Sequence, residues 1–221
     1  MTPSGGTNMN FSTRDIQARC AALGFWPGPI DGKLGKRTER AMDAAGDFMR
    51  QRGKRFFHES GLHRLHFHWT GGGNKANATD KAHYHFLFEG DGHEIAANHI
   101  QAALSHTKNA NSGALGLSLC GMAEAVERPF SAGKAPITEA AVAAMIRRAA
   151  ELCVAFDIPV SRWSTLTHAE IQPTLGIPQR QKWDVNFLPG MTAPTDPITA
   201  GDRLRAMLQA EVDRIAPGFL K

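Results

Sequence analysis

The 221-residue chain has the length of one sizeable domain with a small appendage. Its composition, 42% hydrophobic and 21% charged, is that of a globular protein, and no segment approaches the ~20 apolar residues of a membrane span. We therefore expect no stable membrane association. The net charge of +4 and the pI of 9.1 indicate only weakly a polyanionic partner. The basic residues form no stripe with interleaved aromatic residues, which argues against nucleic-acid binding.

The cysteines and the N-terminal residues bear on the compartment. Three cysteines without C-x-x-C spacing predict reduced, buried thiols in a reducing environment. The first residues, "MTPSGGTNMNFSTRD", lack a basic region followed by an apolar stretch, so they are not typical of a secretory signal. We expect a monomer that is made in, and initially stays in, a cytosol.

Residues 12–53 predict two helices joined by a tight loop. Ser12 or Thr13 can cap the first helix, "WPGPIDGKLG" has the Pro and Gly content of a turn, and the second helix begins at about Thr38. The apolar positions at helical spacing are Ile16, Cys20 and Leu23 in the first helix and Ala41, Ala45 and Phe48 in the second.

From about residue 60 onward, strands alternate with helices. "LHRLHFHW" alternates like a half-buried strand, "HYHFLFEGDGHEIAA" predicts two strands around an Asp-Gly turn, and "ALGLSLCG" and "RWSTLTHAE" predict further strands. The apolar periodicity predicts a helix over residues 137–156 with Thr138 as its cap, and an amphipathic helix over 198–215. The predicted fold class is α/β (α+β), with a central mixed β-sheet flanked by helices.

Histidines near strand ends suggest a metal site. Side chains alternate along a strand, so His66 and His68 share one face while Phe67 takes the other. His68 is the better ligand candidate because it lies at the strand end, next to three glycines. His168 ends a later strand, and Asp184 follows it by sixteen residues. Two histidines and an aspartate can hold a catalytic zinc with one position open to water, although ten histidines allow other combinations.

The N-terminal helices carry a first resemblance. "LGFWPGPIDGKLGKRTERAM" resembles the signature of peptidoglycan-binding domains, which predicts a small helical peptidoglycan-binding-like domain over residues 10–55. The alternative is a helical hairpin that packs on the main domain and binds nothing.

A second resemblance covers residues 62–190. "HFHWTGG", "YHFLFEGDG", "HTKNANSGALGLSLCG", "THAE" and "QKWD", in this order, resemble the zinc-dependent N-acetylmuramoyl-L-alanine amidases, a family that includes phage lysozyme-type amidases, muropeptide-recycling amidases and animal peptidoglycan recognition proteins. The resemblance implies a catalytic domain over 60–221. It implies His68, His168 and Asp184 as ligands of Zn²⁺, Tyr84 and Lys182 as catalytic residues, and His106, Trp69 and Asn111 as substrate contacts. The alternatives to these catalytic roles are that Tyr84 is an ordinary strand aromatic and Lys182 a solvated loop charge.

Two departures from the family pattern affect the prediction. Ser118 stands where the recycling branch has a catalytic glutamate, which favours the phage lysozyme-like branch. The segment between His68 and Tyr84 is rich in Gly, Asn and Asp, so we expect a loop where relatives have a helix, and a more open cleft. Of the other histidines, we expect His63, His93 and His99 at the surface and His85 in the core.

The leading hypothesis is a peptidoglycan hydrolase of the endolysin type. It would cleave the amide between N-acetylmuramic acid and L-alanine by zinc-activated water, and it would wait in the host cytoplasm until a holin releases it to the cell wall. The alternatives are a cytosolic muropeptide-recycling amidase and a non-catalytic peptidoglycan-binding protein.

Overall fold

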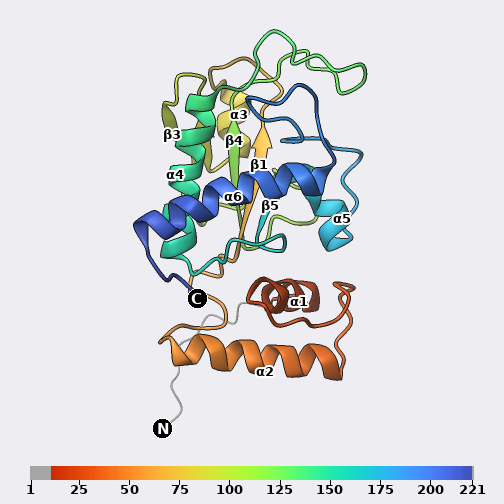
Figure 1. Ribbon diagram of the computed structural model, residues 1–221, viewed down its shortest axis with the longest axis vertical. Coiled ribbons are helices and arrows are strands. Elements are labelled where there is room, and N and C mark those ends of the chain that lie inside the picture. Colours follow the sequence, from red (N-terminus) through yellow and green to blue (C-terminus); the bar gives the residue numbers. More distant parts are fainter. Residues whose placement is uncertain (1–10, 221) are drawn as a thin grey trace.

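A computed structural model describes residues 11–220 of the chain (Figure 1). The first ten residues, which include most of the stretch judged not to be a secretory signal and the first residue of the predicted N-terminal domain, lie outside the described residues.

Within the described residues, five strands form one mixed sheet. They are β1 (Arg64–Trp69), β2 (Phe86–Phe88), β3 (Glu94–Ala96), β4 (Ala114–Leu119) and β5 (Thr165–Thr167). The strand order is β3-β2-β4-β1-β5, with every neighbouring pair parallel except β2 and β3. The mixed α/β class predicted from the sequence is therefore confirmed.

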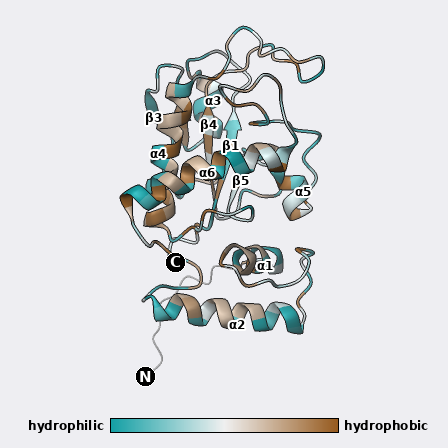
Figure 2. Ribbon diagram, viewed as in Figure 1, coloured by the Kyte–Doolittle hydropathy of each residue, from teal (hydrophilic) through white to brown (hydrophobic). Residues whose placement is uncertain are grey.

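Two long helices, α4 (Glu139–Ala155) and α6 (Pro197–Ile215), pack against one face of the sheet and against each other (Figure 1). Thr138 caps α4 by accepting a hydrogen bond from the Ala141 amide, as predicted, and Asp196 caps α6 in the same way. Figure 2 shows that α4 is mostly hydrophobic, which agrees with the burial of the helix over much of its circumference. None of the helices within residues 11–220 combines the length and apolarity needed to cross a bilayer.

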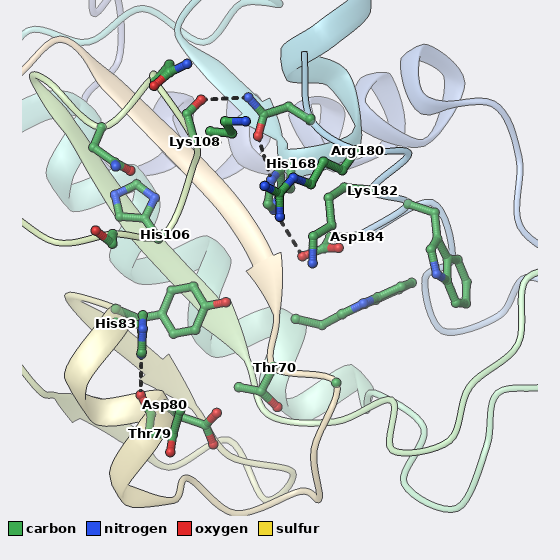
Figure 3. A pocket seen from close by; sticks show the side chains of 18 residues that line it. Thr70, Thr79, Asp80, His83, His106, Lys108, His168, Arg180, Lys182 and Asp184 are labelled. Carbon is green, nitrogen blue, oxygen red and sulfur yellow. Dashed lines mark hydrogen bonds and ion pairs between the residues drawn. The ribbon is translucent and has the colours of Figure 1, made fainter. Parts of the chain in front are cut away.

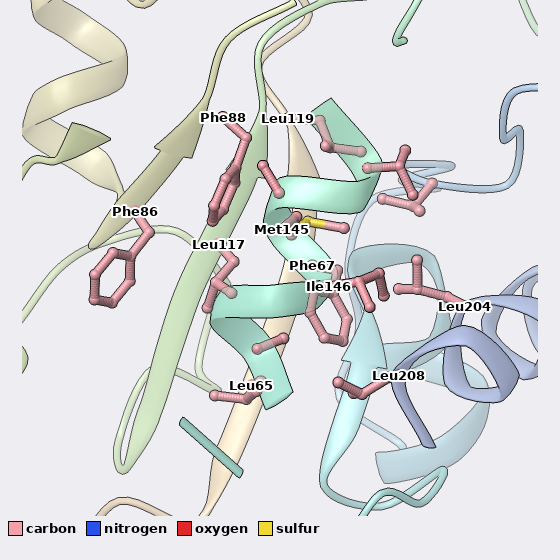
Figure 4. Close-up of a cluster of buried hydrophobic side chains, with 14 of the residues drawn as sticks. Leu65, Phe67, Phe86, Phe88, Leu117, Leu119, Met145, Ile146, Leu204 and Leu208 are labelled. Atoms are coloured by element: carbon pink, nitrogen blue, oxygen red, sulfur yellow. The ribbon is translucent and has the colours of Figure 1, made fainter. Parts of the chain in front are cut away.

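The core lies between these helices and the sheet. Leu65 and Phe67 of β1 point into it beside Leu117, Met145 and residues of α6 (Figure 4). All six residues of β1 are buried, so the prediction of a half-buried strand was wrong. The strand is central in the sheet, and its second face, which carries His66 and His68, is covered by the loop that contains Thr107.

The helix α3 (Ala78–His83) corrects a second expectation, because it occupies the segment predicted to be a loop. Asn77 and Asp80 form a capping box in which each side chain accepts a hydrogen bond from the other residue's backbone amide. This local signal begins the helix despite the preceding polar, glycine-rich run. Tyr84 directly follows α3 as its C-cap and so lies outside the sheet, not in the strand that the sequence pattern suggested.

The N-terminal helices are α1 (Thr13–Ala22) and α2 (Lys36–Gln51), and they lie beneath the sheet-bearing part of the molecule (Figure 1). Ser12 caps α1 in a capping box with Asp15. Figure 2 shows hydrophilic residues at both ends of α2. Ala41 and Ala45 are buried against Cys20 as predicted, whereas Phe48 is only half-buried and Met49 takes the interior position.

Polar contacts join α1 to the rest of the chain. Asp15 accepts a 2.6 Å hydrogen bond from Arg64 of β1, and Arg19 donates to the Asp157 carbonyl at 2.8 Å. His63 is buried by this packing, so the expectation of a surface histidine was wrong, whereas His93 and His99 are exposed and His85 is buried, as expected. All three cysteines of the chain lie among the described residues and are free and buried, which agrees with the predicted thiols.

Candidate metal centre and cleft

The candidate metal ligands meet where two parallel strands end. β1 and β5 are paired in parallel, and Phe67 lies opposite Thr167. The residues that follow these two, His68 and His168, therefore lie side by side. His168 begins a 3-10 turn, η1 (His168–Glu170), directly after β5. Asp184 comes from the loop that follows the short helix α5 (Ile171–Leu175).

Three acceptor atoms converge at this point. His68 Nδ1 lies 3.0 Å from His168 Nδ1, His168 Nδ1 lies 3.3 Å from Asp184 Oδ2, and His68 Nδ1 lies 3.7 Å from the same oxygen. Atoms ~2.0–2.2 Å from a tetrahedral zinc ion are roughly 3.3–3.6 Å apart, so the three separations bracket those of such a site. This group and a neighbouring one, His66, His68 and His106, are the clusters among the described residues that could hold a metal ion.

The electrostatic environment keeps two of the candidate ligands, His68 and Asp184, in the forms that bind metals. Burial lowers the pKa of His68 to about 4, even though Asp184 acts in the opposite direction, so the ring is neutral near pH 7. Burial alone would raise the pKa of Asp184, but the His168 and His68 rings beside its carboxylate hold that pKa below its ordinary value. A neutral imidazole and an ionised carboxylate are the forms that coordinate a metal.

An open cleft of about 810 Å³ lies in front of this centre. The residues predicted as site residues that line it are Trp69, Tyr84, His106, Asn111, His168, Lys182 and Asp184. His68, the remaining one, is fully buried behind the cleft wall. The structure thus brings all eight residues into one region.

Charged side chains are distributed unevenly around the cleft. Figure 3 shows Lys108, Arg180 and Lys182 on the side of His168 and Asp184, whereas Asp80 and His83 lie across the cleft. Lys108 and Arg180 were not singled out from the sequence, although Lys108 lies within the motif "HTKNANSG" and Arg180 directly precedes the motif "QKWD". Their side chains make that wall cationic.

Two aromatic side chains border the metal ligands. The Tyr84 ring centroid lies 5.2 Å from that of His68, and burial together with the Asp184 charge raises the pKa of Tyr84, so its hydroxyl keeps its proton. Trp69 packs edge-on against Trp183 at 4.7 Å, which supports the loop that carries Asp184. Ser118 of β4, which was aligned with the catalytic glutamate of the recycling branch, pairs in register with His68.

The fold and the site define an α/β protein with a cleft at the ends of parallel strands, where two histidines and an aspartate could hold a metal ion. Residues 59–190 match the family described as N-acetylmuramoyl-L-alanine amidase, and the chain belongs to that family. Membership supports activity as a peptidoglycan amidase, a hydrolase.

Solved structures similar to this chain include two proteins from Clostridium intestinale URNW. The N-acetylmuramoyl-L-alanine amidase LysC is 17% identical, with a TM-score of 0.45 over 67% of this chain and 86% of the other. The endolysine N-acetylmuramoyl-L-alanine amidase LysCS is 16% identical, with the same TM-score over 67% of this chain and 84% of the other. A comparison with curated proteins found no match.

Proposed function

We propose that this protein is a zinc-dependent endolysin that cleaves the amide between N-acetylmuramic acid and L-alanine in bacterial peptidoglycan. The observation that carries the proposal is the convergence of His68 Nδ1, His168 Nδ1 and Asp184 Oδ2, with separations of 3.0–3.7 Å, at the back of an open cleft. Family membership supports the amide bond as the target.

His68, His168 and Asp184 would hold the zinc ion. Their three acceptor atoms face one another, and a divalent cation between them relieves the mutual repulsion of their lone pairs and charge. When bound, zinc lowers the pKa of a coordinated water toward ~7 and polarises the amide carbonyl.

The chain's own side chains supply the remaining chemistry. Lys182, on the cleft wall beside Asp184, would stabilise the oxyanion that develops on the substrate carbonyl, an effect worth ~3–4 kcal/mol in comparable sites. Tyr84 keeps its phenolic proton and would donate a hydrogen bond to the same developing charge. The departing amine must also receive a proton, and a group in hydrogen-bond reach must deliver it.

The cationic wall suits an acidic peptide. Peptidoglycan stem peptides carry carboxylates, and Lys108, Arg180 and Lys182 present positive charge on one side of the cleft. We infer that the stem peptide lies along this wall, with its first amide toward the metal centre.

Mass spectrometry of the products released from purified peptidoglycan tests the proposal. Wild-type protein should create free L-alanine amino termini without new reducing sugar ends. Asp184→Ala should create neither, while Asp43→Ala, an exposed carboxylate on α2, should behave as wild type. Reducing ends would indicate a glycosidase. Wild-type protein that holds no zinc and releases no product would favour the non-catalytic binding protein instead.

We further propose that the N-terminal helices, as a domain over residues 10–55, contribute to cell-wall binding. Trp26, in the loop of the peptidoglycan-binding-like signature, is 55% exposed and lies 6.1 Å, centroid to centroid, from Trp163 of the catalytic part. Such an aromatic face can stack on a sugar ring. Trp26→Ala should reduce sedimentation with intact sacculi, whereas Met207→Ala, another exposed apolar side chain, should not.

The contacts of α1 support the alternative, a helical pair that serves only the fold. Ala18 packs with Leu166, Ile171 and Leu175 of the catalytic part, and Arg19 donates to the Asp157 carbonyl. Unchanged sedimentation of Trp26→Ala would decide for this alternative. Comparing turnover on intact sacculi with turnover on soluble muropeptides separates the endolysin from a recycling amidase.

A further inference from the structure

The outward-facing nitrogens of the two ligand histidines each have a defined partner. His68 and His168 turn Nδ1 toward Asp184, and their Nε2 atoms point away from the metal centre. His168 Nε2 lies 3.0 Å from Gln179 Oε1, and His68 Nε2 lies 3.3 Å from Thr107 Oγ1. Both partner side chains are buried.

The amide orientation of Gln179 follows from its other contacts. Its Nε2 donates to the Lys108 carbonyl at 2.8 Å and lies 3.4 Å from the Ile177 carbonyl. Carbonyl oxygens only accept hydrogen bonds, so the amide nitrogen must face them and the amide oxygen must face His168. Because that oxygen only accepts, His168 Nε2 must carry the proton. In the neutral ring the lone pair then lies on Nδ1, which faces Asp184.

Thr107 makes the corresponding contact to His68 within a cluster of rings. Its hydroxyl oxygen lies 3.1 Å from His66 Nδ1, 3.0 Å from His106 Nδ1 and 3.3 Å from His68 Nε2. A hydroxyl donates one hydrogen bond and accepts two, so it satisfies all three contacts only if two of these nitrogens are donors. His68 can be a donor at Nε2 while it leaves Nδ1 free for a metal.

The same hydroxyl argues against a second metal site among His66, His68 and His106. The Thr107 oxygen contacts all three rings at 3.0–3.3 Å and so occupies the space between them. The cluster therefore serves as a hydrogen-bonded support on the far side of His68.

We propose that Gln179 and Thr107 are positioning residues that hold His168 and His68 as Nε2–H tautomers and keep both Nδ1 lone pairs directed at the metal centre. The proposal rests on the proposed function for the identity of the metal, but the tautomers themselves are a property of the metal-free protein. Hydrogen bonds to the far nitrogen of a ligand histidine fix both its orientation and its tautomer.

Gln179 also connects two loops at the centre, and Thr107 lies in the second of them. Gln179 lies in the loop that carries Asp184, yet it donates to Lys108 in the loop of His106 and Thr107. The Thr107 amide in turn donates to Asn111 Oδ1 at 2.7 Å within that second loop. Loss of either side chain should therefore loosen one histidine ligand without removing any ligand atom.

The first measurement is the tautomeric state of the histidine rings in metal-free, ¹⁵N-labelled full-length protein, read from long-range ¹H–¹⁵N correlations. Wild type should show His68 and His168 protonated at Nε2 and unprotonated at Nδ1. Gln179→Met should leave His168 as a mixture of tautomers, and Thr107→Val should do the same for His68. A wild-type spectrum with Nδ1 protonated on either ring would overturn the proposal for that ring.

The second measurement is zinc affinity, obtained by competition with a chromophoric chelator. Gln179→Met and Thr107→Val should each weaken zinc binding by about 10- to 100-fold. Thr107→Ser, which keeps the hydroxyl, should restore binding. The matched controls are Gln181→Met, in the same loop, and Thr38→Val, a buried hydroxyl in α2, and both should bind zinc as wild type does.

These readouts separate failure of this proposal from failure of the proposed function. Unchanged zinc affinity in folded Gln179→Met and Thr107→Val would refute a positioning role even if the wild-type enzyme is fully active. If wild-type protein binds no zinc and releases no product, the proposed function fails, while the ring spectra still decide whether Gln179 and Thr107 set the tautomers. Thermal melting of each variant distinguishes loss of fold from loss of positioning.

Discussion

The contact between Asp15 and Arg64 allows a direct test of how the N-terminal helices are joined to the sheet. Asp15 lies in the first turn of α1, and it accepts a 2.6 Å hydrogen bond from Arg64 at the start of β1. The two side chains are only 12% and 3% exposed. Removing the carboxylate leaves a buried guanidinium without its counter-charge, which costs about 3–5 kcal/mol.

Asp15→Ala should lower the melting temperature substantially. Loss of the capping box at Ser12 adds ~1 kcal/mol to the cost of the broken ion pair. A total of about 4–6 kcal/mol corresponds to roughly 8–24 °C for a chain of this size. Circular dichroism or calorimetry measures the shift, and the exposed Asp43→Ala in α2 is the control that should stay near the wild-type value.

A double variant identifies the cause of the destabilisation. If an uncompensated charge is responsible, adding Arg64→Met to Asp15→Ala should recover part of the lost stability, because the buried charge is then gone. A melting temperature of Asp15→Ala within 2 °C of wild type, or no recovery in the double variant, would refute the reasoning.

The pH dependence of stability has a defined sign at this site. Burial alone would raise the pKa of Asp15, but His63 and Arg64 stabilise the carboxylate and hold the pKa below its ordinary value. A carboxyl with a depressed pKa contributes stability that is fully present above its unfolded value of about 4 and is lost as the pH falls toward the folded value. Wild-type stability should therefore decline below about pH 4 more steeply than that of Asp15→Asn.

Three further predictions concern the site and the core. Lys182→Met should lower kcat by about 10²–10³-fold with zinc affinity unchanged, and Lys33→Met should have no effect; equal loss of zinc from Lys182→Met would contradict the oxyanion role. Tyr84→Phe, which keeps the ring beside His68, should lower kcat on the order of 100-fold, and a wild-type kcat would exclude its hydroxyl from the reaction. Phe67→Ala should cost about 3–5 kcal/mol in denaturant unfolding because its ring is fully buried, and a cost below 1 kcal/mol would contradict the described packing.

Local signals in the sequence determined much of the secondary structure. The caps at Ser12 and Thr138 lie next to periodic apolar residues, and the helices begin where those signals predict. The alternation along β1 placed His66 and His68 on one face, and motif order indicated a set of three metal ligands that the structure brings within 3.7 Å of one another. These features depend on neighbours in the chain or on recognisable short motifs.

Only the tertiary structure decided which surfaces are covered. The second face of β1 is buried because the loop containing Thr107 folds over it, and His63 is buried because α1 packs there. The short helix α3 was missed because its capping box lies in a polar run where composition favours a loop.

The contacts of Thr107 and Gln179 with the two histidine rings could likewise not be predicted from the sequence. Thr107 is 39 residues from His68, and Gln179 is 11 residues from His168. Neither residue type is a metal ligand, and neither spacing is periodic. A hydrogen bond to a ring nitrogen depends on where two side chains meet in space, so the sequence alone determined the candidate ligand types, while the fold decided which nitrogen of each ring faces Asp184.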